Sequence, residues 1–544
     1  MIKKIVIVGG GFAGWYTAVS LQYNLPELEI IIVDSEKHPT IGVGETVGWD
    51  APLNLQRLCG LSDDRLFMYE TGAVYKFGVR GINFFSDNSI HRWGKFLNLK
   101  TSALCNYYNE FDYSDFDEPW NRSPNDIGTM KAWLIRYHAM KNYEDLCLDL
   151  GELNHFLTEP VAPFNRNNKY VLRSAPGHAF GYHIDAEKSG VFLKKIAYQR
   201  NTGKLKHITS SVVNVALADN GSIEKIQLEN GENITGDLFI DASGLQRVIV
   251  SRSTNYSWTG KDHRYSNAAW VCPSRYTDPT KELIGATEFI GDTWGWRFKI
   301  RLFHRIGNGY VFNSDQVDPE KPLATINAAT KTTQLKEPKL IRWSPGEYVH
   351  HWHKNLIPVG MAASFIDPYD APTFDAHSRS LDDLLDLLKN PNKYKNPAEE
   401  YNKRRSYTAE ERNLRLDITF GISQRSGPYW DLRRQIAQEK NCLRELKNII
   451  LEKRLDLESR MTWHWHQQYI RSAMAAKVDM TDWEFPKVPD KDLDMLTAFY
   501  NFNRQRNKHI TQQEWPNYST WLQQNRFNDQ TNQQVLQRLQ PQLC

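Results

Sequence analysis

The feature that most constrains this chain is a glycine-rich turn set between a strand and a helix close to its beginning. Residues 2–8, IKKIVIV, form a β-branched run that predicts a buried strand. GGGFAG follows at once, and the next stretch, WYTAVSLQYNL, has the spacing of a helix. A second strand is expected over 29–33, ending at Asp34. The chain is therefore expected to open with a β-α-β unit.

The glycines of this turn match a dinucleotide-binding pattern, because Gly9, Gly11 and Gly14 fit G-x-G-x-x-G. The first glycine allows a tight turn, the second lets the backbone approach a pyrophosphate, and the third lets the helix pack closely on the strand. Phe12 and Ala13 then begin a helix whose N-terminal N–H groups favour phosphate. Asp34 stands where a carboxylate accepts hydrogen bonds from a ribose.

Two later stretches favour FAD over NAD as the dinucleotide. One is IGVGET, which contributes Gly42, Val43, Gly44, Glu45 and Thr46. The other is DLFIDASG (237–244), a predicted strand that ends at Asp241 with Gly244 close behind it. This second stretch resembles the late flavin-contacting motif of FAD-dependent monooxygenase-like proteins. The resemblance implies that its backbone reaches the flavin and that Asp241 faces the ribityl-phosphate arm.

The remaining sequence predicts an α/β chain (α+β overall) in two parts. Residues 1–377 are expected to form a Rossmann-like FAD-binding domain with an added β-sheet layer and a surface insertion near 100–130. Short strands and turns dominate around 165–300, whereas helical patterns take over after 378 and predict a mostly helical C-terminal lobe over 378–544.

Composition excludes several classes of function. The formal net charge of +3 gives no reason to expect a nucleic-acid or membrane partner. None of the six cysteines lies in a C-x-x-C pair, so a zinc site or a dithiol redox pair is not expected. We find neither a signal peptide nor an apolar run long enough to span a bilayer, so the default expectation is a reducing, cytoplasmic setting.

Five collinear motifs resemble those of the flavin-dependent halogenases, best known as tryptophan halogenases, and together with the glycine-rich turn they cover residues 5–430. They are IGVGET (41–46), YKFGVRGINF (75–84), YHIDA (182–186) followed by FLKKIA (192–197), NLIPVGMAASFIDPYDAP (355–372) and RSGPYW (425–430).

This resemblance implies a function and a set of site residues. Reduced FAD, delivered by diffusion from a separate flavin reductase, reacts with O2 and a halide ion to give hypohalous acid. The acid passes through an internal tunnel to Lys76, which activates it for halogenation of a small electron-rich aromatic substrate. Gly360 and Asp367 lie in the stretch that carries the flavin-strap contacts, and Asp370 matches the active-site acid.

Three departures from the family pattern bear on substrate and halide. Asp370 replaces a glutamate that is one methylene longer. Pro372 and Thr373 stand where the family binds halide with backbone N–H groups, and proline has none. This predicts a preference for bromide or iodide over chloride. The aromatic wall that separates substrate from flavin survives only in part, as Trp296 and Phe298. Tryptophan itself is therefore not the expected substrate, and a core role for these aromatic residues stays open.

Other interpretations remain open. The chain could be an FAD-dependent hydroxylase, or a non-catalytic relative that binds flavin only. The histidine pairs His351/His353 and His464/His466 have metal-ligand spacing on a strand, but no cysteine or carboxylate cluster completes either set, so no metal is expected. The sequence leaves homo-oligomerisation open.

Overall fold

The computed structural model describes residues 2–93 except 38–41, 49–50, 62–64 and 89, and residues 181–451 except 201–202, 254–256, 261–262 and 370–371. It also describes 173–174, 177–178, 516–526 and a few positions between 469 and 483. The expected surface insertion near 100–130 and the pair His464/His466 lie outside the described residues.

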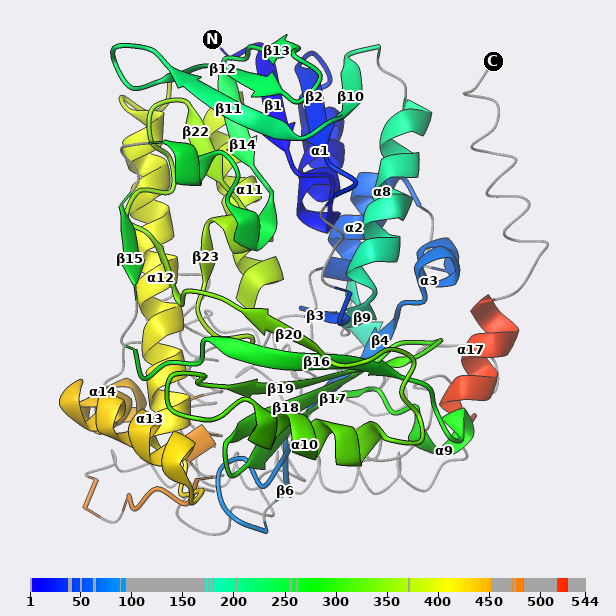
Figure 1. Cartoon of the computed structure of the whole chain (residues 1–544), viewed down its shortest axis with the longest axis vertical. Helices are drawn as coiled ribbons and strands as arrows, with labels where there is room; N and C mark the ends of the chain where they lie inside the picture. Colours follow the sequence, from blue (N-terminus) through cyan, green and yellow to red (C-terminus); the bar gives the residue numbers. More distant parts are fainter. Residues whose placement is uncertain are drawn as a thin grey trace, which may run out of the picture.

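A five-stranded parallel sheet forms the dinucleotide half of the molecule (Figure 1). Its strands, in spatial order, are β10 (Leu205–Thr209), β2 (Glu29–Asp34), β1 (Lys4–Val8), β14 (Leu238–Asp241) and β22 (Leu356–Pro358). Ile5 and Ile7 point to one face, beneath helices α1 (Phe12–Asn24) and α8 (Ala186–Arg200). Val6 and Val8 point to the other face, which is covered by β11 (Val212–Leu217) and β12 (Ile223–Leu228). Burial on both faces explains why the first strand is continuously apolar.

A second, seven-stranded mixed sheet lies beside the first and forms the added β-layer. Its order is β20 (Lys339–Arg342), β16 (Ala268–Ser274), β19 (Ile306–Phe312), β18 (Gly295–Arg301), β17 (Ala286–Asp292), β5 (Gly78–Ile82) and β6 (Ile90–Trp93). Helix α10 (Glu320–Thr330) covers one face of this sheet, and the other carries an aromatic core that includes Phe289 and Trp296.

A small three-stranded sheet lies between the two larger ones. It consists of β3 (Glu45–Val47), β9 (Gly181–Ile184) and β4 (Val74–Lys76), with β9 in the centre. The remaining described elements are α2 (Ala51–Cys59), α3 (Arg65–Thr71), β7 (Arg173–Ser174), β8 (Gly177–His178), β13 (Asn233–Ile234), β15 (Trp258–Gly260), α9 (Pro279–Glu282), β21 (Gly346–Tyr348), β23 (Ser364–Phe365) and three 3-10 turns (Gly244–Gln246, Val250–Arg252 and Gly360–Ala362).

From residue 372 onward every described element is a helix: α11 (Pro372–Lys389), α12 (Pro397–Gly421), α13 (Pro428–Glu439), α14 (Cys442–Leu451) and α17 (Tyr518–Arg526). Helix α11 packs on α1, while α12 runs past both large sheets and packs on α13 and α14 (Figure 1). The boundary expected near 377 falls inside α11, so the helical lobe continues directly from the cofactor-binding part.

The fold class is confirmed: an α/β chain with a Rossmann-like sheet, a further sheet and a run of C-terminal helices. The longest described helix that the sequence analysis missed is α8, which lies in the stretch described as strands and turns. Its buried residues Phe192, Leu193, Ile196 and Ala197 follow helical spacing, and they pack in the core shared with α1. Among the described helices, none is both long and apolar enough to cross a membrane.

Candidate active site

A cavity of about 750 Å3 lies between the carboxyl ends of the parallel strands and the aromatic face of the seven-stranded sheet. Val8 and Asp34 border it from the first sheet, and Phe289, Phe298 and Ile300 border it from the second. Ligands of open α/β sheets bind outside the carboxyl ends of the strands, and this volume is within the range of cofactor pockets. The sequence-predicted residues that line it are Gly9, Gly11, Phe12, Ala13, Asp34, Val43, Gly44, Glu45, Thr46, Gly244, Phe298, Gly360 and Thr373.

The glycine turn has no room for side chains. Gly9 has φ +117°, and a Cβ there would lie 2.4 Å from the carbonyl oxygen of Ala242. A Cβ on Gly14 would lie 1.8 Å from the carbonyl oxygen of Gly9, which is the close packing expected of the third glycine. Gly10, which the sequence analysis passed over, is also confined, because a Cβ there would lie 2.1 Å from the Asp34 carboxylate.

The N-terminus of α1 is left available to a ligand. Its N-cap is Gly11, which supplies no side-chain hydrogen bond, and the first turn contains no acidic residue. The first N–H groups of a helix lack partners within the helix and carry partial positive charge, so they suit phosphate oxygens. Asp34 ends β2 beside this turn, and its half-exposed carboxylate borders the cavity where a ribose would lie. These features fit the pyrophosphate and ribose of FAD.

The IGVGET segment forms a second wall of the cavity and is fixed from behind. The guanidinium of Arg305 donates to the carbonyl oxygen of Gly42 at 3.1 Å and to Asp185 at 2.8 Å. Gly307 lies so close that a Cβ there would be 1.7 Å from the carbonyl oxygen of Val43. Gly42 itself serves as this anchor and does not line the cavity, whereas the next four residues do.

Glu45 is the titratable group of this wall. Burial raises the pKa of its carboxyl to about 7. A carboxyl with that pKa can either hold or release a proton near neutral pH, as acid–base work requires.

Two aspartates expected to contact the cofactor are turned away from the cavity. Asp241 is fully buried, and its carboxylate accepts hydrogen bonds from Ser243 and from the N–H groups of Ile249 and Val250. The carboxylate of Asp241 is thus engaged by its own loop, and its expected place beside the ribityl-phosphate arm stays a prediction. Its role is to shape the loop after β14, and residues 242–246 of that loop do line the cavity.

Asp367 is likewise buried. It accepts hydrogen bonds from the Ser266 hydroxyl at 2.7 Å and from the Tyr369 N–H at 3.0 Å. Burial raises the pKa of Asp367, while the nearby Arg433 acts in the opposite direction. The carboxylate thus ties this segment to Ser266, which lies just before β16, and does not border the cavity.

The two residues of the expected aromatic wall separate in the structure. Phe298 borders the cavity, whereas Trp296 is fully buried in the core of the second sheet. Its indole packs edge-on against Phe84, Phe289 and Tyr369. Trp296 therefore takes the core role that the sequence analysis had left open, because the aromatic strap residue Tyr369 occupies the space in front of it.

Lys76 ends β4 and does not border the large cavity, but a polar chain connects its surroundings to the cavity wall. In the small sheet, His183 of β9 pairs with Val74 of β4 and with Thr46 of β3. Strand alternation therefore places Lys76, His183 and Thr46 on the same face. Lys76 is partly buried, and its positive charge is close enough to contribute to the lowered pKa of His183.

The imidazole of His183 is held at both nitrogens. Its Nδ1 lies 3.0 Å from the carbonyl oxygen of Arg301, and its Nε2 lies 2.8 Å from the Thr287 hydroxyl. Burial lowers the pKa of His183 well below its ordinary value, so the ring is neutral. Because a carbonyl can only accept, the ring proton resides on Nδ1 and Nε2 accepts from Thr287. The Thr287 oxygen lies 3.3 Å from the hydroxyl of Thr46, which borders the cavity.

The segment expected to bind halide lies at the start of α11. Pro372 is the first residue of that helix, and Thr373, the second, borders the large cavity. Asp370 lies outside the described residues, so its position as an acid is not tested. His351 and His353 do not converge: His351 borders a small cavity, while His353 borders a separate surface groove. Among the described residues no cluster of three metal-binding side chains occurs.

Sequence reasoning missed several residues that shape this region, chiefly Gly10, His183, Thr287 and His377. His183 lies within the YHIDA motif, so its position was visible although its role was not. Thr287 and His377 carried no signal, since their partners are distant in sequence. His377 contacts Thr17 of α1 across 3.0 Å, and burial lowers its pKa to about 4.

Comparison with known proteins agrees with this geometry. The model of the tryptophan halogenase family matches residues 4–483. A tryptophan 6-halogenase of Streptomyces albogriseolus is 25% identical over 68% of this chain and 67% of its own length. A tryptophan 7-halogenase of Lentzea aerocolonigenes is 24% identical over 68% of this chain and 67% of its own length.

Solved structures share the fold. A flavin-dependent halogenase from Xanthomonas campestris has a TM-score of 0.75 and 20% identity, and the alignment covers 96% of this chain and 98% of that one. A tryptophan halogenase from Shewanella frigidimarina has a TM-score of 0.78 and 22% identity, with 97% of this chain and 98% of that one covered.

The family match agrees with the geometry of the cavity, because its glycine turn and uncapped helix suit a flavin dinucleotide. The enzyme class of its relatives implies FAD as the cofactor, and the residues at Gly9–Gly14 and Asp34 fit that group. This chain belongs to the tryptophan halogenase family of flavin-dependent oxidoreductases.

Proposed function

We propose that this enzyme oxidises halide to hypohalous acid and uses Lys76 to halogenate a small electron-rich aromatic substrate. Reduced FAD, when bound, would supply the reducing equivalents for the reaction with O2. The sum balances: reduced FAD, O2, a halide ion and a proton give oxidised FAD, hypohalous acid and water. The reduced flavin would reach the enzyme by diffusion from a separate reductase.

The observation that carries the proposal is the polar chain from the cavity wall to Lys76. Thr46 borders the cavity, and Thr287 and His183 lead from it to the face of the small sheet that bears Lys76. A lysine ammonium at this position would donate a hydrogen bond to the oxygen of hypohalous acid and make the halogen more electrophilic. Burial lowers the pKa of His183, so its neutral imidazole adds no positive charge beside Lys76.

The halide preference belongs to the same proposal. Pro372 removes one backbone donor at the first turn of α11, while Thr373 keeps its N–H beside the cavity. Chloride is the most strongly hydrated and the hardest to oxidise of the three halides. A cradle with fewer donors therefore favours bromide or iodide. Product ratios from assays with equimolar halides measure this preference, and mainly chlorinated product would contradict it.

The decisive assay supplies reduced FAD, mixed halides and a panel of indoles and phenols, with products read by mass spectrometry. Lys76→Ala should consume reduced FAD and release hypohalous acid while halogenated product falls about 1,000-fold, within the range of a lost catalytic group. Lys195→Ala removes an exposed lysine of α8 and should keep wild-type product. Full product formation by Lys76→Ala would refute the assignment of that residue.

A hydroxylase remains the rival function, and the same assay separates the two. Omitting halide should abolish product if the proposal holds. Hydroxylated product formed at an undiminished rate in halide-free buffer would establish the rival instead. FAD binding without any halogenated or hydroxylated product would point to the non-catalytic alternative.

A further inference from the structure

A second, smaller cavity of about 40 Å3 adjoins the large one. The two cavities share Gly360, Phe365, Thr373 and His377 in their walls, so they meet beside the first turn of α11. A water molecule needs roughly 10–15 Å3 of such space. The smaller cavity can therefore hold a few waters or one monoatomic ion, and it is too small for an organic anion of metabolite size.

Two guanidinium groups from α12 line this cavity, and each has an unpaired donor. Arg405 is only 7% exposed, and Arg412 follows two turns later on the same helix. The Nε atom of each arginine is buried without a hydrogen-bond partner among the described residues. An unsatisfied buried donor costs about 1–3 kcal/mol, so both positions call for an acceptor that the protein itself does not supply.

The terminal nitrogens of these two arginines already donate hydrogen bonds to protein groups. Arg405 donates through its terminal nitrogens to Asp383 and to the carbonyl oxygen of Ala376. Arg412 donates to Glu347 at 2.8 Å, and Asn413 donates to the same carboxylate at 2.9 Å. The two carboxylates are thus already neutralised by direct contacts. Neither remains as an uncompensated negative charge that would exclude an anion.

The titratable groups that line the cavity from other elements are Glu347, which is paired with Arg412, and the histidines His351 and His377. Burial lowers the pKa of Arg412; Glu347 acts in the opposite direction, and the nearby Arg415 and Arg405 lower it further. Arg415 adds a third guanidinium group to Arg405 and Arg412, and the carboxylates around them are those of Glu347, Asp383 and Asp382. Burial also lowers the pKa values of His351 and His377 to about 4, so both imidazoles are neutral near pH 7 and add donors or acceptors without charge.

The N-terminus of α11 adds partial positive charge beside the cavity. Thr373 is the second residue of an 18-residue helix and lies in the walls of both cavities. The N-terminus of such a helix carries about half a positive elementary charge. The buried arginine donors and the helix terminus thus converge on one space that opens toward the place where halide is consumed.

We propose that the small cavity is a waiting site for a single halide ion, held by Arg405 and Arg412 and passed to the large cavity beside Thr373. The binding of the ion stands on the geometry of this cavity, whereas its delivery rests on the proposed function. A halide accepts hydrogen bonds from every direction, so it can bind a buried Nε donor without the fixed geometry that a carboxylate requires.

Direct binding is tested with crystals of the full chain soaked in sodium bromide, with data collected at the bromine absorption edge. The expected result is an anomalous peak between Arg405 and Arg412. Ala409→Leu should abolish this peak, because Ala409 lines the cavity on α12 between the two arginines and leucine is also a good helix former. Arg405→Lys, which keeps the charge but removes the Nε donor, should weaken it.

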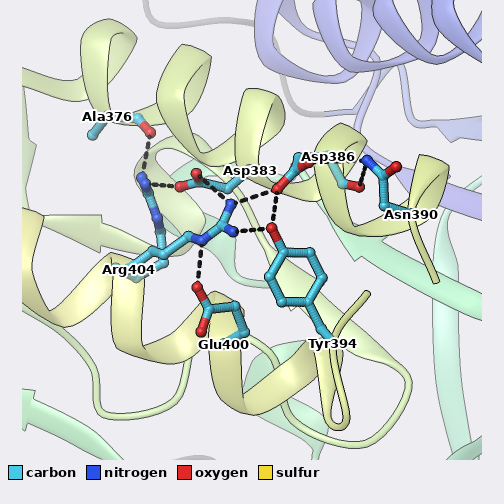
Figure 2. A network of polar contacts seen from close by, with 8 residues as sticks. Ala376, Asp383, Asp386, Asn390, Tyr394, Glu400 and Arg404 are labelled. Carbon is cyan, nitrogen blue, oxygen red and sulfur yellow. Dashed lines mark hydrogen bonds and ion pairs between the residues drawn. The ribbon is translucent and has the colours of Figure 1, made fainter. Parts of the chain in front are cut away.

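The matched control is Arg404→Gln on the same helix. Arg404 does not line the cavity, and its guanidinium is engaged by Glu400, Asp383, Asp386 and Tyr394 (Figure 2). This variant should keep the bromide peak. Absence of a peak in the unmodified protein, or a peak that persists in Ala409→Leu, would overturn the site.

Delivery is tested by the bromide dependence of halogenation. Ala409→Leu and Arg405→Lys should each raise KM for bromide about tenfold, the effect of losing roughly one charge-assisted hydrogen bond, with kcat unchanged at saturating bromide. Suppose that the unmodified protein shows the bromide peak but Ala409→Leu has an unchanged KM for bromide. The peak would then mark an adventitious ion only, and the waiting site would be refuted. If the unmodified enzyme halogenates nothing, the proposed function fails, while the diffraction result still decides whether the anion site exists.

Discussion

The two ends of the large cavity are built in different ways. At the nucleotide end, comprising Gly9–Gly14 and residues 241–246, backbone lies directly on backbone, and the missing Cβ atoms of the glycines allow this close packing. At the strap end, comprising residues 360–374 with α11 and α12, positions are set by buried histidines, arginines and hydroxyl groups from distant segments. The first end responds to added volume. The second responds to charge and pH.

The largest expected effect comes from adding a methyl group at the nucleotide end. In Gly14→Ala the new Cβ would lie 1.8 Å from the carbonyl oxygen of Gly9, and neither backbone can yield. We expect FAD affinity to fall by more than about 100-fold, or at least 2.7 kcal/mol, measured by flavin-fluorescence titration.

Gly10→Ala sharpens this prediction as its matched control. Its Cβ would meet the Asp34 carboxylate, which can rotate away at the cost of its ribose contact. A loss of about tenfold is expected, equal to one hydrogen bond of ordinary strength. If Gly10→Ala lowered FAD affinity more than Gly14→Ala, close contact between backbone atoms would not be the distinguishing feature of the nucleotide end.

The strap end should show itself in the pH dependence of stability. His377 is buried, and its pKa is lowered from 6.5 to about 4. The folded state therefore favours the neutral ring. This contribution is fully present above pH 6.5 and is lost as pH falls toward 4, because the unfolded chain takes up the proton first. The loss is roughly 3 kcal/mol by pH 4.

Urea unfolding at pH 7 and pH 4.5 measures this effect, and His377→Gln should flatten the profile. His351 has the same pKa direction and contributes in the same window, so the flattening is expected to be partial. An identical pH slope in His377→Gln and the unmodified protein would contradict the assignment.

The polar chain that joins Thr46 through Thr287 to His183 should have an intermediate effect on stability. Thr287→Val removes the hydroxyl that donates to Nε2 of His183 and leaves a buried acceptor unsatisfied. The expected cost is about 1–3 kcal/mol in the free energy of unfolding. Thr287→Ser keeps the hydroxyl and should retain most of the stability. Equal losses in both variants would show that packing, rather than the hydrogen bond, matters there.

The smallest effect on the free energy of unfolding is expected at the partly exposed ion pairs of Arg404. The Arg404 side chain is 25% exposed and contacts three carboxylates at the outer side of α11 and α12 (Figure 2). Arg404→Gln should cost about 1 kcal/mol or less, and the difference should shrink in high salt because exposed ion pairs are screened. A large loss of stability in Arg404→Gln that does not depend on salt would contradict this prediction. It would show that the ion pairs of Arg404 behave as buried ones.

Much of the nucleotide end could be predicted from the sequence. The strand, the turn, the helix and Asp34 lie within one short segment, and each has a local signature: β-branched residues, glycines at fixed spacing and a carboxylate at the strand end. The direction in which the carboxylates of Asp241 and Asp367 point could not be predicted. A strand position identifies where such a residue lies, but the loop that bends back over it decides whether its carboxylate faces ligand or protein.

The sequence alone thus determined the β-α-β opening, the fold class and the family, because these depend on short-range patterns and on motifs in a fixed order. Only the tertiary structure decided that Trp296 belongs to the core while Phe298 borders the cavity, and that Thr287 links Thr46 to His183, which lies on the same sheet face as Lys76. It also brought Arg405 and Arg412 of one helix beside the first turn of another. These arrangements depend on contacts between residues far apart in the chain, where the free energy of burying or pairing a polar group is set by neighbours that no local pattern specifies.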